Sequence, residues 1–354
     1  MEAKLYETLE DLLQGLQDID KDVVRRRFGL HAPKETLQEI GDDYGVTRER
    51  IRQIQNRAMD SIVPKAKKHT FIVLLSTKAK QHLGKVGVKR EKTVTKNFAE
   101  ANQISEKGES LLAFLILLSE KLHHHEETNE LHAFISASEK QTRLAKHVLK
   151  KILTKFAANP EKTYTGEEIL AFVEKEIQKH IGVKAKEDEL YDFLRILKPI
   201  GRNPFGQFGL LEHNQITPSS LAHKILYLLE NQGKPMHFNE IFESLKHMDE
   251  IQDDFLSNRW KKNYNRSSIQ NHLIMNPEFV WIGRGTYALK KWGYKEGNVF
   301  DRMVEIVKKN KSIQKERLYE MLSAEKQFSK ITFEVYIRNK KYFAIKDGTI
   351  RLSK

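Results

Sequence analysis

Four polar side chains near position 50 have the residue types and spacing needed to contact DNA bases. Arg48, Glu49, Arg52 and Gln53 lie at i, i+1, i+4 and i+5, so a helix would place them on one face. Arg pairs bidentately with guanine, Gln pairs with adenine, and Glu accepts a hydrogen bond from cytosine N4. The pattern predicts base reading in the major groove. The alternative is a solvated charged face stabilised by pairs of opposite charge.

A second group of side chains could bind a metal ion. His123, His124 and His125 are followed by two glutamates, and His132 would lie across a turn if this segment formed a hairpin. Three imidazoles and a carboxylate could hold zinc. The sequence contains neither an HExxH pattern nor a second such cluster. We therefore interpret the segment as a hairpin with ordinary histidines, and predict no metal.

Enzymatic chemistry is not indicated elsewhere. The chain has no Cys, which excludes thiolate catalysis, disulfides and thiolate metal sites. It contains neither GxxxxGK[ST] nor GxSxG, and no paired-carboxylate nuclease signature. We expect a binding protein that is not an enzyme, with no cofactor and no small-molecule substrate.

Two short helices are predicted to position the base-reading side chains. The first ends near Gly45, which suits the left-handed residue after a helix. Gly41 has no side chain to obstruct a crossing helix, and Thr47 is placed to cap the second helix. This spacing is typical of a helix-turn-helix, whose two helices cross closely at a steep angle.

The second helix is predicted to be amphipathic. Its expected core face consists of Val46, Ile51, Ile54 and Ala58. Pro64 is expected to bend or end this helix, because proline lacks the backbone N–H that an internal helical position donates.

The segment from about Leu9 to Lys68 resembles region 4 of bacterial primary-type sigma factors. The matching strings are VVRRRFGL, TLQEIGDDYGVTRERIRQI and QNRAMDSI. The resemblance implies that this helix reads the −35 promoter element in double-stranded DNA, with Arg48, Glu49, Arg52 and Gln53 at the base-reading positions and Thr36 at a phosphate. It also implies docking on the RNA polymerase β flap. The phosphate candidates are Thr36, Thr47, Arg50, Arg57, Lys65, Lys67 and Lys68.

One departure from the sigma pattern affects the expected function. Sigma factors open the −10 element with an aromatic-rich helical domain that precedes region 4. Here the resemblance begins almost at Met1. The expectation is a protein that recognises promoter-like DNA without a promoter-melting domain, and is not a complete sigma factor.

The remaining sequence reads as variations on one unit of three helices followed by a hairpin. Residues 218–294 resemble the HARE-type winged helix, through PMHFNEI and FVWIGRGTYAL. That family occurs in the RNA polymerase delta subunit, in restriction systems and in chromatin proteins, and some members contact protein instead of DNA.

The predicted fold is mainly α with small β-hairpins, built as a tandem array of helix-turn-helix and winged-helix domains. The predicted domains are 1–70 (sigma region 4-like), 71–139 (a degenerate winged-helix-like unit), 140–217 (winged-helix-like), 218–296 (HARE-type) and 297–354 (winged-helix-like). The candidate linkers are Lys85–Lys92 and joints near Glu139, Thr217 and Gly297.

The net charge of +13 is unevenly distributed. Residues 1–46 carry 6 basic and 11 acidic side chains (net −5), residues 47–70 carry 7 and 2 (net +5), and residues 298–354 carry 14 and 7 (net +7). Winged helices bind DNA through the third helix and the wing, or serve as protein-docking modules. The secondary DNA-binding candidates are Arg266, His272, Arg284, Arg338, Lys340, Lys341 and Lys346.

The sequence also bears on location and on the class of function. The longest apolar run, Leu111–Leu118, is too short to cross a bilayer, and the acidic N-terminus is not a signal peptide. We expect a cytoplasmic, nucleoid-associated, transcription-related protein that binds DNA sequence-specifically. The alternatives are a scaffold that docks on RNA polymerase, or the DNA-sensing component of a restriction or mobile-element system.

Overall fold

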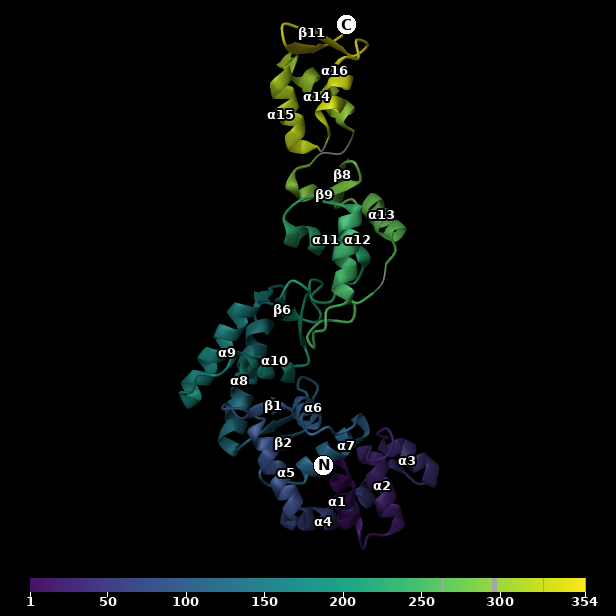
Figure 1. The fold of residues 1–354 in the computed structure, drawn as a ribbon, viewed down its shortest axis with the longest axis vertical. Helices are drawn as coiled ribbons and strands as arrows, with labels where there is room; N and C mark the ends of the chain where they lie inside the picture. The colour runs from purple at the N-terminus through teal and green to yellow at the C-terminus, as the bar shows by residue number, and fades with distance from the viewer. Residues whose placement is uncertain (263, 295–297, 327, 354) are drawn as a thin grey trace. The chain divides into compact units, whose positions relative to one another are not determined.

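The computed structural model describes residues 1–262, 264–294, 298–326 and 328–353. The chain divides into two compact units, Met1–Ile200 and Gly201–Lys354. Each unit is built mainly of helices, with short strands that form small antiparallel sheets (Figure 1). The predicted fold class, mainly α with small hairpins, is confirmed.

The first unit begins with four helices that contain the helix-turn-helix. They are α1 (Glu2–Leu13), α2 (Asp18–Phe28), α3 (Leu37–Tyr44) and α4 (Arg48–Lys68). The prediction that Pro64 ends the last helix is wrong, because α4 runs on to Lys68. Pro64 and Asp60 are both exposed, so water can bond the carbonyl that the missing N–H leaves open.

The next segment has its own sheet. Its elements are α5 (Thr70–Gln81), β1 (Val88–Arg90), α6 (Glu91–Ala101), α7 (Glu106–Leu117), β2 (His123–His125) and β3 (Phe134–Ser136), and the sheet order is β1-β3-β2. The predicted linker Lys85–Lys92 is therefore wrong. Val86 and Val88 are buried, and β1 pairs with β3 through Lys89 and Ile135.

A single hydrophobic cluster joins these two segments across residue 70. It includes Leu5 and Leu9 of α1, Ala58 and Ile62 of α4, and Leu111, Phe114 and Leu115 of α7. The Phe28 ring lies 4.7 Å from the Phe114 ring between centroids, and the Ser105 hydroxyl donates to Glu2 Oε1 at 2.6 Å. The helix-turn-helix thus shares its core with the segment that follows it. The five-domain division itself stays a prediction.

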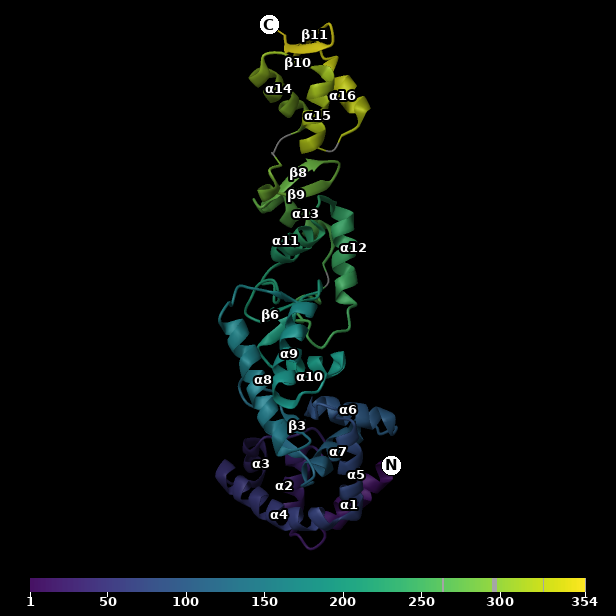
Figure 2. The same ribbon diagram turned by 90° about the vertical axis from the view of Figure 1, so that its left-hand side faces the viewer.

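The first unit continues with three helices and short strands. They are α8 (Glu139–Ala157), β4 (Tyr164–Thr165), α9 (Gly166–Ile181) and α10 (Glu187–Ile196), followed by β5 (Ile200–Arg202), which ends in the second unit. Both α9 and α10 contact α8 (Figure 2). The three helices predicted for the unit 140–217 are thus α8, α9 and α10.

The second unit contains β6 (Gln207–Leu210) and two further modules. The first comprises α11 (Leu221–Gln232), β7 (Met236–His237), α12 (Phe238–Asp249), α13 (Arg266–Met275), β8 (Phe279–Gly283), β9 (Thr286–Leu289) and a 3-10 turn, η1 (Lys290–Trp292). The second comprises α14 (Val299–Asn310), β10 (Ile313–Gln314), α15 (Lys315–Glu325), α16 (Lys330–Ile337), β11 (Phe343–Lys346) and β12 (Thr349–Leu352). The predicted joint at Gly297 lies outside the described residues.

One order of elements recurs from residue 70 to residue 352: helix, strand, helix, helix, strand, strand. In the sheets β1-β3-β2, β7-β9-β8 and β10-β12-β11, the first strand pairs with the last. Sequence reasoning found the three helices and the hairpin but missed this first strand. It is only two or three residues long, which is too short for an alternating pattern to stand out.

The described residues include no helix that is long and apolar enough to cross a membrane. The eight-residue apolar run instead lies at the end of α7 and its C-cap, where most of its side chains are buried against other helices of the first unit.

We predict that Leu115→Ala weakens the helix-turn-helix as well as α7. Leu115 is fully buried in the shared cluster, so its truncation should cost about 2–5 kcal/mol in chemical denaturation of the full chain. Hydrogen exchange should show reduced protection in α1 and α4 together with α7. Leu74→Ala, at a leucine that is 51% exposed, is the matched control. Unchanged protection in α1 and α4 would contradict the shared core.

Candidate nucleic-acid interface

The helix-turn-helix is held in shape by an arginine that joins two of its helices. Arg26 of α2 donates through Nε to both carboxylate oxygens of Glu35, each at 3.0 Å, and it also pairs with Asp43 of α3. The hydrogen bonds that Arg26 donates to Glu35 and Asp43 raise the pKa of Arg26. Beneath this polar contact, Val23, Ile40, Ile51 and Ile54 form a small apolar core. These contacts fix α3 and α4 relative to α2.

A capping box fixes the start of α3. The Thr36 hydroxyl accepts from the Glu39 backbone N–H at 3.2 Å, and the Glu39 carboxylate accepts from the Thr36 N–H at 2.7 Å. The backbone hydrogen bond from Thr36 lowers the pKa of Glu39. Thr36, predicted to contact phosphate, is thus at the N-terminus of a helix, where backbone N–H groups favour anions.

The turn between α3 and α4 has the geometry predicted for it. Gly45 adopts a left-handed conformation with φ of 64°, and the Val46 N–H donates to the Gly41 carbonyl at 2.9 Å. A Cβ atom on Gly41 would lie 2.8 Å from the Val46 carbonyl oxygen. The Thr47 hydroxyl accepts from the Arg50 N–H at 3.2 Å and caps α4. The close crossing of the helices therefore requires glycine at position 41.

The four predicted base-reading residues lie together on the exposed face of α4's first turns. Arg48, Glu49, Arg52 and Gln53 are all exposed, whereas Ile51 and Ile54 are buried on the opposite face. The assignment of Val46 to the buried face is wrong, because this side chain is 37% exposed. Val46 precedes the helix, so the helical period does not apply to it.

Ion pairing organises this exposed face in the absence of DNA. Arg52 donates to both oxygens of Glu49, at 2.9 and 2.7 Å, and Arg50 donates to Gln53 Oε1 at 3.2 Å. The Arg52 hydrogen bonds lower the pKa of Glu49, and the same contact raises the pKa of Arg52. Arg48 makes no ion pair with any described residue. The free protein thus holds Arg52 in one orientation, and a guanine would have to replace Glu49 as its partner.

Three of the predicted phosphate contacts are already engaged within the protein. Arg57 pairs with buried Asp20 of α2, and Lys67 pairs with Glu120. The Lys65 ammonium donates to the Gln14 carbonyl at 2.6 Å, just beyond the end of α1. These contacts hold α4 to its neighbours. Among the described residues, Lys68 has no ion-pair partner.

One basic residue near this face is not among the residues predicted from the sequence. Lys34 is exposed two residues before the capped start of α3 and makes no ion pair with the part of the chain that the structure describes. Its position two residues before the Thr36 capping box could have indicated a phosphate contact in the sequence, because a cation beside a helix N-terminus adds to the preference of that terminus for anions.

The secondary candidates in residues 218–294 are placed less favourably for DNA. Arg266 begins α13, where its guanidinium pairs with Glu243 at 3.1 Å and lies 4.8 Å from the Phe242 ring centroid. His272 is half-buried on the same helix. Arg284 is exposed at the tip of the β8–β9 hairpin with φ of 47°. Of these three, Arg284 is the most accessible.

In the C-terminal module, the predicted basic residues are all exposed. Arg338 follows α16, Lys340 and Lys341 precede β11, and Lys346 ends β11 beside the Asp347-Gly348 turn. The third helix itself is different. Its exposed face carries Ile331 (76% exposed) and Val335 (61% exposed), which cannot form hydrogen bonds or ion pairs with bases or phosphates. Sequence reasoning missed these residues because their helical spacing resembles that of a core face.

The histidine hairpin forms as predicted, but its side chains diverge. His124 bonds to Glu91 at 2.7 Å, whereas His125 stacks on Phe134 and bonds to Thr142 Oγ1 at 3.2 Å. Burial lowers the pKa of His125 to about 4, and the nearby Lys146 charge adds to this effect. Within the described residues, no group of three or more potential ligands is placed to hold a metal ion.

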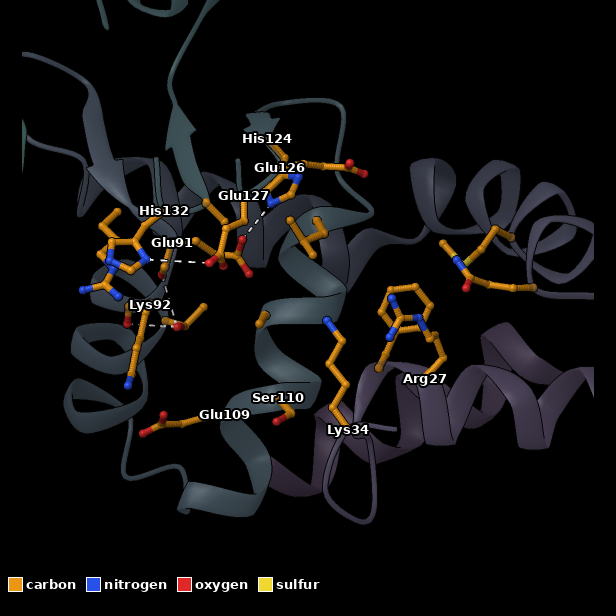
Figure 3. Close-up of a pocket in the computed structure, with 18 residues that line it drawn as sticks. Arg27, Lys34, Glu91, Lys92, Glu109, Ser110, His124, Glu126, Glu127 and His132 are labelled. Atoms are coloured by element: carbon orange, nitrogen blue, oxygen red, sulfur yellow. Dashed lines mark hydrogen bonds and ion pairs between the residues drawn. The ribbon is translucent and has the colours of Figure 1, made fainter. Parts of the chain in front are cut away.

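A cavity of about 810 Å³ lies in the first unit between the helix-turn-helix and the following segment (Figure 3). Its lining is balanced in charge. The basic residues are Arg27, Lys34, Arg90 and Lys92, and the acidic residues are Glu91, Glu109, Glu126 and Glu127. Glu91 is paired with His124. This balance favours neither an anionic nor a cationic ligand.

Comparison with known proteins identifies the N-terminal segment. Residues 12–62, from α1 into α4, match the family Sigma-70, region 4. Over 56 residues the chain is 52% identical to RNA polymerase sigma factor SigA of Listeria monocytogenes serovar 1/2a, and equally to SigA of Listeria innocua serovar 6a. The match covers 16% of this chain and 15% of each relative. The sigma resemblance is confirmed over this segment, and the HARE-type resemblance stays a prediction.

We predict that Gly41→Ala disrupts the helix-turn-helix. The added methyl would meet the Val46 carbonyl at 2.8 Å, so the variant should lose about 1–3 kcal/mol of stability in thermal denaturation. Gly45→Asn is the control, because asparagine tolerates the left-handed conformation and no atom lies within 4 Å of a Cβ there. Equal stability of Gly41→Ala and wild type would contradict the close crossing.

We also predict an acid-dependent decrease in stability through His125. Unfolding restores its pKa from about 4 to 6.5, so the unfolded chain binds a proton that the folded chain does not between these pH values. Stability should therefore fall as pH drops from 6.5 to 4. His125→Gln should flatten this dependence in urea titrations. His123→Gln, at an exposed position of the same strand, controls for removal of an imidazole. An unaltered pH dependence in His125→Gln would contradict the assignment.

Proposed function

We propose that this protein binds double-stranded DNA sequence-specifically, in association with transcription, by reading a −35-like element with α4. The observation that carries the proposal is the exposed group Arg48, Glu49, Arg52 and Gln53 at the start of a capped helix, within a segment that matches Sigma-70, region 4. Recognition helices commonly contact base edges with their N-terminal residues.

The proposed mechanism is binding without bond chemistry. Arg52 exchanges its carboxylate partner Glu49 for guanine O6 and N7, and Gln53 exchanges Arg50 for adenine. Phosphate contacts at the N-terminus of α3, with Thr36 and Lys34, set the register on the duplex. A protein used in this way is not an enzyme, and nucleoid association would follow from its DNA affinity.

Docking on the RNA polymerase β flap and a HARE-type role for residues 218–294 are further parts of the proposal. The sigma match supports an interaction with polymerase in general terms. The recurring order of helices and strands in 221–289 supports a winged module.

Selection of bound duplexes from a random pool tests the base-reading role. Wild type should enrich a TTGACA-like motif. Arg52→Ala should bind the selected site about 5- to 150-fold more weakly at fixed salt and accept other bases at one position. Arg317→Ala is a matched control, because Arg317 is an exposed arginine that pairs with Glu320 three residues away, as Arg52 pairs with Glu49.

Two outcomes would reject the proposal. One is the absence of any enriched motif. The other is an enriched motif that Arg52→Ala selects with wild-type affinity and preference.

A second candidate function, protein docking, is favoured by one observation. The third helix of the C-terminal module exposes Ile331 and Val335 where a DNA-binding winged helix would carry polar side chains. A scaffold role predicts that an Ile331→Ser, Val335→Ser double variant fails to retain RNA polymerase in a pull-down but keeps its DNA affinity. Retention of polymerase would count against docking through this helix.

A further inference from the structure

Helix α8, the first helix of the module formed by residues 139–217, carries as much net positive charge as the proposed base-reading helix α4. It contains six basic residues and one acidic residue, for a net charge of +5. Helix α4 contains seven and two, also +5. The rest of that module, residues 158–217, has eight basic and ten acidic residues. The positive charge of this module is therefore concentrated in α8, because the acidic residues of 158–217 outnumber the basic ones.

Four of the basic side chains form one stripe along α8. Lys140, Arg143, Lys146 and Lys150 lie at i, i+3, i+6 and i+10, so a rotation of 100° per residue places them within about a third of the helix circumference. All four are exposed. The opposite face, with Leu144, Val148, Leu149 and Ile152, is buried, and α9 and α10 contact the helix (Figure 2).

The stripe is left almost without neutralising partners. Lys140, Lys146 and Lys150 make no ion pair with any described residue, and Arg143 reaches Glu139 only at 4.0 Å. Lys146 and Lys150 are like charges four residues apart, an arrangement that weakens a helix slightly. A helix face that only contacts water more commonly carries charges of both signs, as α9 does with four acidic and two basic residues.

On the side of α8 that faces α9, the basic side chains lie close to a carboxylate. Glu176 of α9 is buried, pairs with Lys179 at 2.6 Å and lies 3.6 Å from His147 of α8. The Lys179 hydrogen bond lowers the pKa of Glu176, and the charge of Lys151 acts in the same direction. Acidic side chains therefore compensate the positive charge of α8 on the side that faces α9, but not along the stripe.

We propose that the Lys140–Arg143–Lys146–Lys150 stripe is a second DNA-binding site, which contacts the phosphate backbone without reading sequence. Ten residues of helix span about 15 Å, comparable to four or five base-pair steps of B-DNA. Side chains at this spacing neutralise successive phosphates and release counterions. The site rests on the proposed function: α4 selects the sequence, and α8 adds sequence-independent affinity on flanking DNA.

The test measures binding of the full chain to the selected duplex, extended by random flanks, across a range of salt concentrations. In the variant Lys140→Gln, Arg143→Gln, Lys146→Gln, Lys150→Gln, the negative slope of log affinity against log salt should become shallower. The change should be about 0.9 for each phosphate that the stripe no longer neutralises, so up to about 3.6. The variant's sequence preference should equal that of wild type.

The control variant removes the same net charge elsewhere in the first unit. It carries Lys78→Gln, Lys80→Gln, Lys96→Gln and Lys107→Gln, at exposed lysines of α5, α6 and α7. Its salt slope should stay near that of wild type, whereas a general charge effect would make both slopes equally shallower. Circular dichroism and thermal denaturation check that both variants are folded.

The outcomes separate this inference from the proposed function. An unchanged slope in the α8 variant, or an equal change in the control, overturns the second site. If Arg52→Ala loses sequence preference while the α8 variant behaves as wild type, the base-reading role stands alone. If neither variant alters DNA binding but the α8 variant no longer retains polymerase in a pull-down, the stripe contacts protein and the inference is wrong.

Discussion

The apolar stripe of α4 is the constraint on which the rest of the first unit depends. Ile51 and Ile54 pack into the small core of the helix-turn-helix, and further along the same helix Ala58, Ile62 and Ala66 enter the large cluster with α1 and α7. Because a helix is stiff, burial of its C-terminal half fixes the orientation of its N-terminal half. The exposure of Arg48, Arg52 and Gln53 therefore depends also on the packing of Ala58, Ile62 and Ala66 further along the same helix.

That stiffness also explains why Pro64 is tolerated. The prolines that end helices do so when the missing hydrogen bond and the ring clash outweigh local packing. Here Ile62 and Ala66, on either side of Pro64, are fully buried, and the proline itself faces solvent. The tertiary contacts therefore outweigh the local preference. The sequence shows the proline directly, whereas Ile62 and Ala66 belong to a cluster that also contains side chains of α1 and α7, far from them in the chain.

Local signals predict local structure well. The left-handed conformation of Gly45 and the Thr47 cap each depend on atoms within a few residues, and both are present. The errors concern long-range contacts. Lys85–Lys92 resembles a linker in the sequence because its pairing partner, β3, lies more than forty residues later. The ion pair between Arg57 and Asp20 cannot be read from the sequence either, because the two residues are 37 positions apart.

The sequence does indicate that α7 is enclosed by other helices. A helix that is apolar on one face needs one partner, whereas a helix that is apolar all around must be enclosed. Leu111, Leu112, Phe114, Leu115 and Ile116 cover more than one face of α7, and all are buried. The apolar run is too short for a membrane span, and residues 71–139 provide only some of its packing partners. The helix-turn-helix supplies the others.

The two most basic helices differ in how their charge is compensated, and this difference separates two uses of a cation. On α4, Arg52 is held by Glu49, and Arg57 and Lys67 by Asp20 and Glu120, so charge there positions side chains. On α8, three lysines of the stripe have no described ion-pair partner. A paired guanidinium keeps a defined direction, which favours discrimination among bases. An unpaired ammonium keeps its full Coulomb attraction for phosphate, which favours affinity. The proposed function requires both selection of a DNA site and affinity for it, and it assigns one helix to each task.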